Sequence, residues 1–160
     1  SAFAVLYSFQ LRNLLKGIGQ QMKWSVRDES LHSKMGCKLF RHMCEEDNSL
    51  LSECREDIIA AAETMVNLEE KYINKMFEMG DVEGIKSYDL KQFIKKRTNE
   101  KLVELGYVDL GSYFAYDTKA AGNLDWFYHL TGGVTHTDFF ATRPTDYSKA
   151  GEGEDFEDIW

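Results

Sequence analysis

The chain has 160 residues, of which 43% are hydrophobic, and a formal net charge of −8 at pH 7. This length allows one domain with a hydrophobic core, and the acidic balance argues against a nucleic-acid-binding surface, which needs a basic stripe. No run of about 18 apolar residues and no basic-then-apolar leader occurs, so the sequence predicts neither a membrane span nor a signal peptide. The three cysteines lack metal-finger spacing and are typical of buried thiols in a reducing compartment, so we expect a cytoplasmic protein.

Apolar residues recur at three- and four-residue steps through residues 1–106, which is typical of amphipathic helices. The only proline is Pro144, so no proline interrupts this region. We expect helices over residues 3–15, 18–44 and 49–79, and a fourth that begins near residue 82 or 89 and ends at 105. Gly106 suits the C-cap of the fourth helix. The sequence therefore predicts an all-α bundle over residues 1–106.

Residues 107–150 are rich in Gly, Tyr, Phe, Thr and Asp, so we expect an irregular segment that wraps on the bundle. Aromatic side chains are expected to hold this segment down. They are Tyr113, Phe114, Trp126, Phe127, Phe139 and Phe140. Residues 151–160 hold five carboxylates and no basic residue, which predicts a flexible acidic tail.

The one Glu-x-x-His of the chain is formed by Glu29 and His32, in the middle of the second predicted helix. At this spacing a carboxylate and an imidazole project from one face, one turn apart, within reach of one divalent metal. Asp28 faces elsewhere, so its natural role is to accept a hydrogen bond from a ligand histidine of another helix. The bulky apolar neighbours, such as Trp24 and Leu31, predict that this face is buried. Taken alone, the motif is more often a solvated surface pair.

The stretch Arg27-Asp28-Glu29-x-x-His32, followed by Gly36, resembles the fifth core helix of class I ribonucleotide reductase small subunits. Further stretches resemble other elements of this family, in family order. They are residues 1–19 for the preceding helix, Glu69-x-x-Tyr72 with Phe77-x-x-Gly80 for the next helix, residues 93–106 for the one after, residues 123–126 for an Asn-Pro-x-x-Trp motif, and residues 139–147 for a Phe-Phe-Glu-x-Arg-x-x-x-Tyr motif. The chain departs from these patterns at Leu124, where proline is usual, and at Ala141, where glutamate is common.

The resemblance implies a partial ferritin-like bundle, made of the C-terminal helices of the small subunit. Ferritin-like dinuclear metal proteins combine two Glu-x-x-His helices with two helices that each supply a glutamate. The implied function is that of a ribonucleoside-diphosphate reductase subunit. It helps to hold a dinuclear metal centre and relays a radical to the large subunit, which converts ribonucleotides to deoxyribonucleotides. The metals are expected to be iron, with manganese or a mixed pair as alternatives.

The resemblance also implies roles for single residues. Glu29 and His32 ligate one metal, and Asp28 lies on the proton-coupled electron path. Phe3 lines the cavity beside the metals, and Ser25, one helical turn before Glu29, alters that cavity with a hydroxyl. The residues implied for contact with the large subunit are Tyr147, as the radical relay, and Phe156, Ile159 and Trp160, as apolar anchors of the docking tail.

The other ligands of the family, and its usual radical tyrosine, fall before residue 1. His42, His129 and His136 have no glutamate three residues earlier, and we expect no metal role for them. We therefore expect an obligate partner, namely an N-terminal small-subunit segment or chain, beside the large subunit and a second small subunit. A bundle interrupted in this way exposes an apolar face that favours association.

Three alternatives stay open from the sequence. A di-metal oxidase related to these small subunits shares Asp-Glu-x-x-His but lacks the relay tyrosine and the docking tail. A non-catalytic subunit binds the large subunit through its tail and holds no metal. A helical module with an accidental Glu-x-x-His is the third.

Overall fold

The computed structural model describes residues 1–127, and these residues form an all-helical protein. The helices are α1 (Ala2–Leu11), α2 (Lys16–Glu46), α3 (Leu50–Glu53), α4 (Arg55–Met76), α5 (Ser87–Leu105), the 3-10 helix η1 (Val108–Leu110) and α6 (Thr118–Gly122). The described residues contain no strand, only an isolated bridge between Val82 and Ile85. The predicted all-α class is therefore confirmed.

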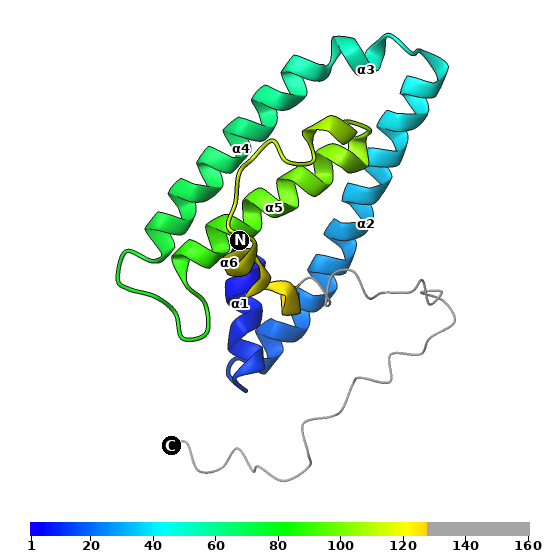
Figure 1. Ribbon diagram of the computed structural model, residues 1–160. Helices are drawn as coiled ribbons and strands as arrows, with labels where there is room; N and C mark the ends of the chain where they lie inside the picture. Colours follow the sequence, from blue (N-terminus) through cyan, green and yellow to red (C-terminus); the bar gives the residue numbers. More distant parts are fainter. Residues whose placement is uncertain (128–160) are drawn as a thin grey trace, which may run out of the picture.

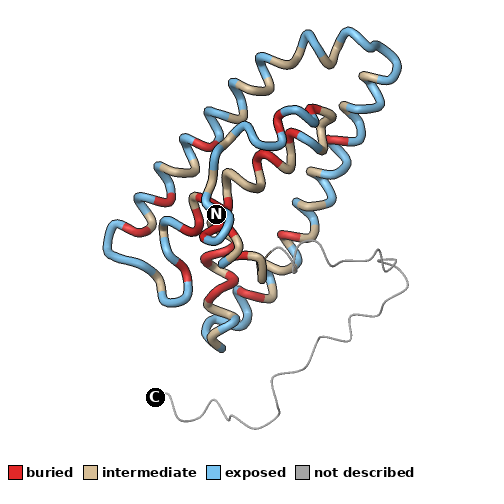
Figure 2. The backbone as a smooth tube through the Cα atoms, in the orientation of Figure 1, coloured by how far each residue is buried: buried red, intermediate tan, exposed pale blue. Residues whose placement is uncertain are grey.

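Helix α5 is the central element of the structure, because it packs against α2, α4 and α6 (Figure 1). Helix α1 packs on α2 at the opposite end of the molecule from α3 (Figure 1). Much of α2 and one side of α4 are exposed, whereas α5 carries many of the buried positions (Figure 2). No helix within residues 1–127 is long and apolar enough to cross a lipid bilayer.

The helix boundaries agree with the sequence at the end of α5 and differ from it at two other places. Gly106 has φ 113°, in the left-handed region, and caps α5 as predicted. Helix α1 ends at Leu11, earlier than predicted, because Asn13 and Leu15 adopt positive φ and turn the chain into α2. The predicted third helix is divided at Cys54, whose ψ of −6° bends the chain between α3 and α4.

The main core joins the two ends of the described chain. Leu124, which is 1% exposed, inserts among residues of α1, α4 and α5. The buried members are Ala4, Val5, Ile73, Phe77, Ile85, Leu90, Phe93 and Leu124. A second cluster of Leu102, Tyr107 and Leu110 lies near the other end of α5, against Phe40 and Leu51. These two clusters fix α5 and everything that wraps on it.

Residues 107–127 are held to α5 mainly by buried polar side chains. Asn99 makes two 2.9 Å hydrogen bonds with the backbone of Phe114: its amide nitrogen donates to the carbonyl, and its oxygen accepts from the N–H. The Gln92 side-chain oxygen accepts from the N–H of Asp117 at 3.0 Å. The Asn123 amide donates to the Asp89 carboxylate at 2.9 Å. We call Asp89, Gln92 and Asn99 the α5 clamp.

Aromatic contacts add to the clamp, as the sequence predicted for this segment. Trp126 stacks on Tyr7 of α1 at 6.3 Å between ring centroids, and Phe127 meets Phe93 edge-on at 6.2 Å. Tyr113 and Phe114 contact each other at 5.0 Å. Phe139 and Phe140 lie outside the described residues. The segment boundaries at 106 and 150 stay predictions.

Candidate metal centre

Helix α2 runs unbroken from Lys16 to Glu46 and carries Glu29 and His32 near its middle. Strong helix formers and the absence of proline favour this continuity. The start of α2 lies close against α1 at Gly19, where an added Cβ would meet the Gln10 side chain at 2.3 Å. Further along, Val26 and Cys37 are buried on one side of α2. This packing fixes the orientation of the Glu-x-x-His face.

Glu29 and His32 are both exposed, one turn apart. Within residues 1–127 neither side chain has a hydrogen bond or an ion pair, in contrast to His42, whose ring nitrogens lie 3.4 Å from Glu45 and 3.7 Å from Glu46. A carboxylate oxygen and an imidazole nitrogen are therefore free to bind an ion. This donor pair fits one metal of a dinuclear centre, in which each metal takes both types of ligand.

The prediction that neighbouring apolar residues bury this face is wrong for the described chain. Trp24, Leu31 and Met35 are 50%, 47% and 58% exposed. At about 100° per residue they lie on the side of α2 opposite to Val26 and Cys37. Within residues 1–127, helix α2 packs mainly on α1 and α5, and its buried residues Val26 and Cys37 lie on one side.

The described residues provide an incomplete site. No group of three or more His, Cys, Asp or Glu side chains in residues 1–127 is placed to hold a metal ion. Asp28 is exposed, about 100° around the helix from Glu29, and has no hydrogen-bond partner in the described part of the chain. A complete centre needs about four carboxylates and two histidines.

The remaining candidate residues are divided between the helices and the tail. Phe3 on α1 and Ser25 on α2 are half-buried. The four candidates of the C-terminal region, Tyr147, Phe156, Ile159 and Trp160, lie outside the described residues, as do His129 and His136.

The α5 clamp was not recognised from the sequence. The sequence did contain a sign of the clamp, because Asp89, Gln92 and Asn99 are polar residues spaced to share one side of a helix. A polar side chain on a buried side needs a hydrogen-bond partner. The partner backbone, however, lies 15 to 34 residues further along the chain, where no sequence pattern marks it.

A salt bridge between Arg55 and Asp109 links the start of α4 to η1. Arg55 donates hydrogen bonds to the Asp109 carboxylate from its two terminal guanidinium nitrogens, Nη1 and Nη2, and lies over the Tyr107 ring, 5.7 Å from its centroid. The hydrogen bond from Arg55 lowers the pKa of Asp109 below its ordinary value. This pair holds the chain where it leaves α5, at the far end from α1.

The architecture and the Glu-x-x-His helix define a ferritin-like helical protein. The chain matches the family model of the ribonucleotide reductase small chain over residues 1–111. It therefore belongs to the ribonucleotide reductase small-chain family.

The similar proteins bear out this assignment. A probable ribonucleoside-diphosphate reductase small subunit of Invertebrate iridescent virus 3 is 32% identical over 94% of this chain and 39% of its own length. The corresponding protein of Invertebrate iridescent virus 6 is 29% identical over 100% of this chain and 50% of its own length. The subunit beta of Chlamydia pneumoniae is 27% identical, over 94% and 42%. No solved structure matches. The chain thus spans half or less of these relatives.

Proposed function

We propose that this chain is part of the small subunit of a ribonucleoside-diphosphate reductase, and that it supplies Glu29 and His32 to a dinuclear metal centre. The observation that carries the proposal is the pair itself: two unpaired donors, one turn apart on α2, in a chain of the small-chain family. Iron suits this carboxylate and imidazole pair, and manganese suits it as well.

Each residue near the pair has a defined task in this proposal. Glu29 and His32 hold one metal, and the bound centre supplies one-electron oxidation to the subunit. Asp28 accepts a hydrogen bond from a ligand histidine of another helix and fixes the ring orientation of that histidine. Phe3 and Ser25 line the cavity beside the centre.

The other ligands come from the part of a small chain that this chain does not span. This chain covers only 39–50% of the length of these relatives. This supports the view, because the uncovered part of each relative can hold the remaining helices of a bundle. A separate or covalently continuous N-terminal segment completes the site, and a second small subunit completes the dimer.

The C-terminal region serves the large subunit, with Tyr147 as the radical relay. Phe156, Ile159 and Trp160 anchor the acidic tail in a groove, a mode that suits a short peptide with spaced apolar residues. These events take place in the cytoplasm, where ribonucleotides are reduced.

The test is the metal content of the full chain, alone and together with the N-terminal segment of a small chain from the same genome. We expect two metals per complex and reductase activity only with the segment and the large subunit. Glu29→Ala and His32→Ala each weaken metal binding by at least about tenfold. His42→Ala and Glu45→Ala are the matched controls, because both side chains are exposed on the same helix, and they leave metal content unchanged.

A second function has one observation in its favour, namely that residues 1–127 bring no group of three or more His, Cys, Asp or Glu side chains together to hold a metal ion. A non-catalytic subunit binds the large subunit through its tail and holds no metal. In that case the complex with the N-terminal segment is metal-free, and deletion of residues 151–160 abolishes binding to the large subunit. The oxidase alternative instead predicts a metal-loaded complex that does not bind the large subunit.

A further inference from the structure

Two cysteines lie at the corner where the chain turns from α2 into α3 and α4 (Figure 1). Cys44 is in the last turn of α2, and Cys54 is the residue between α3 and α4. Only residues 45–53 separate them along the chain, and α3 packs on both α2 and α4. The two thiols therefore belong to one short reversal of the chain, residues 44–55, which we call the α2–α4 corner.

Both cysteines lie on helix sides that face the second hydrophobic cluster. Cys44 follows Phe40 by four residues, and Cys54 follows Leu51 by three, so each shares a helix side with a residue packed on that cluster. The buried Tyr107 ring lies 6.3 Å from the Phe40 ring, and its hydroxyl donates a 2.9 Å hydrogen bond to the Leu51 carbonyl. The two thiols are thus directed toward the same buried ring from the two arms of the corner.

The electrostatics of the corner agree with this geometry. Partial burial raises the pKa of the Cys44 thiol above its ordinary value, and the nearby Cys54 raises it further. Burial likewise raises the pKa of Tyr107, and Cys54 and then Cys44 add to that rise. Because the interaction between charges falls with distance, these mutual effects require the three groups to lie close together. The corner therefore holds a cluster of two thiols and one phenol.

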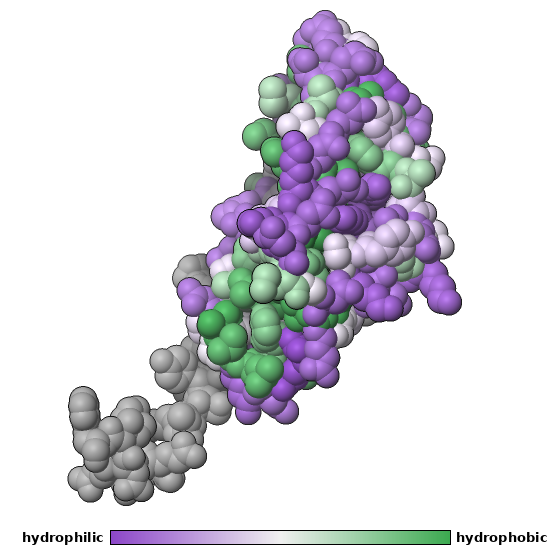
Figure 3. Space-filling view, turned by 90° about the vertical axis from the view of Figure 1, so that its left-hand side faces the viewer, coloured by the Kyte–Doolittle hydropathy of each residue, from purple (hydrophilic) through white to green (hydrophobic). Residues whose placement is uncertain are grey.

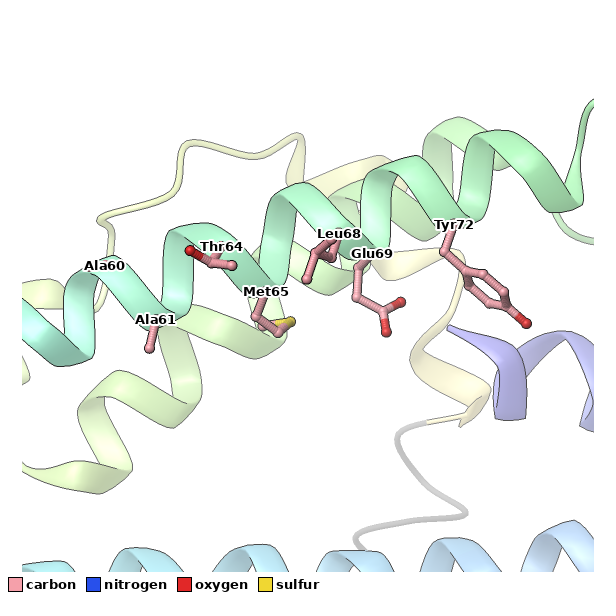
Figure 4. Close-up of a pocket in the computed structure, with 7 residues that line it drawn as sticks. All are labelled: Ala60, Ala61, Thr64, Met65, Leu68, Glu69 and Tyr72. Carbon is pink, nitrogen blue, oxygen red and sulfur yellow. The ribbon is translucent and has the colours of Figure 1, made fainter.

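The corner is packed, yet its two thiols can be reached from solvent. The middle of α4 borders an open hollow of about 640 Å³, which Met65 and Tyr72 line (Figure 4). At the corner, by contrast, the second hydrophobic cluster fills the space beside the start of α4. Cys44 and Cys54 are nevertheless partly exposed, unlike the buried Cys37. Hydrophilic residues predominate at this end of the molecule, around α3 at the top of Figure 3, so a small water-soluble reagent can approach.

Two neighbouring thiols can bind a soft metal or form a disulfide. A closed thiolate site for zinc needs about four ligands, and residues 1–127 contain no group of three or more His, Cys, Asp or Glu side chains placed to hold a metal. We propose that Cys44 and Cys54 form a reversible disulfide by exchange with a low-molecular-weight disulfide such as oxidised glutathione. The link fixes the end of α2 to the start of α4.

The exchange takes place in two steps. The thiolate of one cysteine attacks the small disulfide, a mixed disulfide forms, and one small thiol leaves. The thiolate of the other cysteine then attacks the protein sulfur of the mixed disulfide, and the second small thiol leaves. Overall, two protein thiols are oxidised by two electrons, one small disulfide is reduced to two thiols, and the two protons lost by the cysteines are taken up by the two released thiols.

The short helix α3 allows the two sulfurs to reach bonding distance. A disulfide bond is about 2.05 Å long and tolerates little distortion. Helix α3 has four residues, none of them buried, so it can adjust without loss of core contacts. In a reducing compartment such a pair stays in the thiol form and becomes linked only when the small disulfides accumulate.

The experiment treats the reduced full chain, without oxygen, with oxidised glutathione at about 0.1 mM, which is below the effective concentration of a thiol on the same chain. We expect the linked chain, lighter by two hydrogens in its intact mass, to exceed the mixed disulfide at least about tenfold. A proteolytic digest should contain a peptide pair joined through Cys44 and Cys54, and dithiothreitol should separate it. The linked chain should also unfold at a higher temperature than the reduced chain.

Single variants separate the roles of the two thiols. Cys44→Ser and Cys54→Ser should each retain one glutathione on the remaining cysteine of the pair, and neither should show the rise in Tm on oxidation. Cys37→Ala is the matched control, because it removes the buried thiol of the same chain. It should form the link as the parent does.

Three results overturn the inference. The first is a parent chain that keeps glutathione on Cys44 or Cys54 without forming the link. The second is a link that uses Cys37 or joins two chains. The third is a folded chain whose Cys44 and Cys54 stay unmodified under conditions in which the urea-unfolded chain reacts. The inference goes beyond the proposed function and holds whether or not Glu29 and His32 bind a metal.

Discussion

At the scale of single residues, Glu29 and Asn99 differ in whether the described residues satisfy the hydrogen bonds of their side chains. Asn99 is 2% exposed and has its hydrogen bonds satisfied by the Phe114 backbone, so its role is complete within the described residues. Glu29 is exposed and unpaired there. The sequence pointed to Glu29 through its spacing from His32, whereas the only sign at Asn99 was its place among polar residues on one side of α5, with no partner visible in the sequence.

Replacement of Asn99 by leucine tests the clamp. The change leaves the N–H and carbonyl of Phe114 without partners in a partly buried place, and we expect the free energy of unfolding to fall by about 2–4 kcal/mol. Urea unfolding followed by circular dichroism measures this loss. Asn67→Leu, on the exposed surface of α4, should change stability by no more than about 0.5 kcal/mol. Equal effects of the two variants would show that Asn99 does not hold the wrapping segment.

At the scale of helices, the end of α5 was predictable from the sequence because a glycine marks it. Gly106 ends α5 as expected, because its φ of 113° suits a residue without a Cβ. Asn13, Leu15 and Cys54 also interrupt the helices, yet none of them is a residue type that requires a break. Their conformations depend on tertiary packing, which propensity alone does not describe.

Two glycine substitutions should therefore have opposite effects. Gly106→Ala places a Cβ at a left-handed position and should destabilise the chain by about 1 kcal/mol. Gly36→Ala lies inside α2, where an added Cβ meets nothing within 4 Å, and should stabilise by about 0.5–1 kcal/mol. Thermal melts of the two variants give the comparison. A stabilising Gly106→Ala would contradict the assigned helix end.

The Arg55–Asp109 pair predicts a pH dependence of the link between α4 and η1. Because Arg55 lowers the pKa of Asp109, the pair stabilises the fold above the unfolded pKa of about 3.9, and this contribution is lost as pH falls through the lower, folded value. Asp109→Asn should thus destabilise the chain at pH 7, and the difference from the parent should shrink as the pH is lowered below about 4. Glu53→Gln, an exposed carboxylate on α3, is the control, measured by urea unfolding at each pH. A gap that stays constant across this range would rule out the proposed linkage.

At the scale of the whole molecule, the described residues form a helical protein with exposed apolar residues on α2 and α4 and one Glu-x-x-His pair on α2. The class of fold was predictable, since the three- and four-residue periodicity is local to each helix. The exposure of the Glu-x-x-His face was not, because burial depends on which segments pack on α2, and the periodicity along one helix does not describe this.

The most direct test of the proposed ligands Glu29 and His32 is to locate the metals. Crystals of the full chain in complex with the N-terminal small-chain segment, loaded with iron, would be measured by anomalous diffraction at the iron edge. We expect two neighbouring iron positions, one of them ligated by Glu29 and His32. Iron bound elsewhere, or a complete complex without iron or manganese at these two side chains, would contradict it.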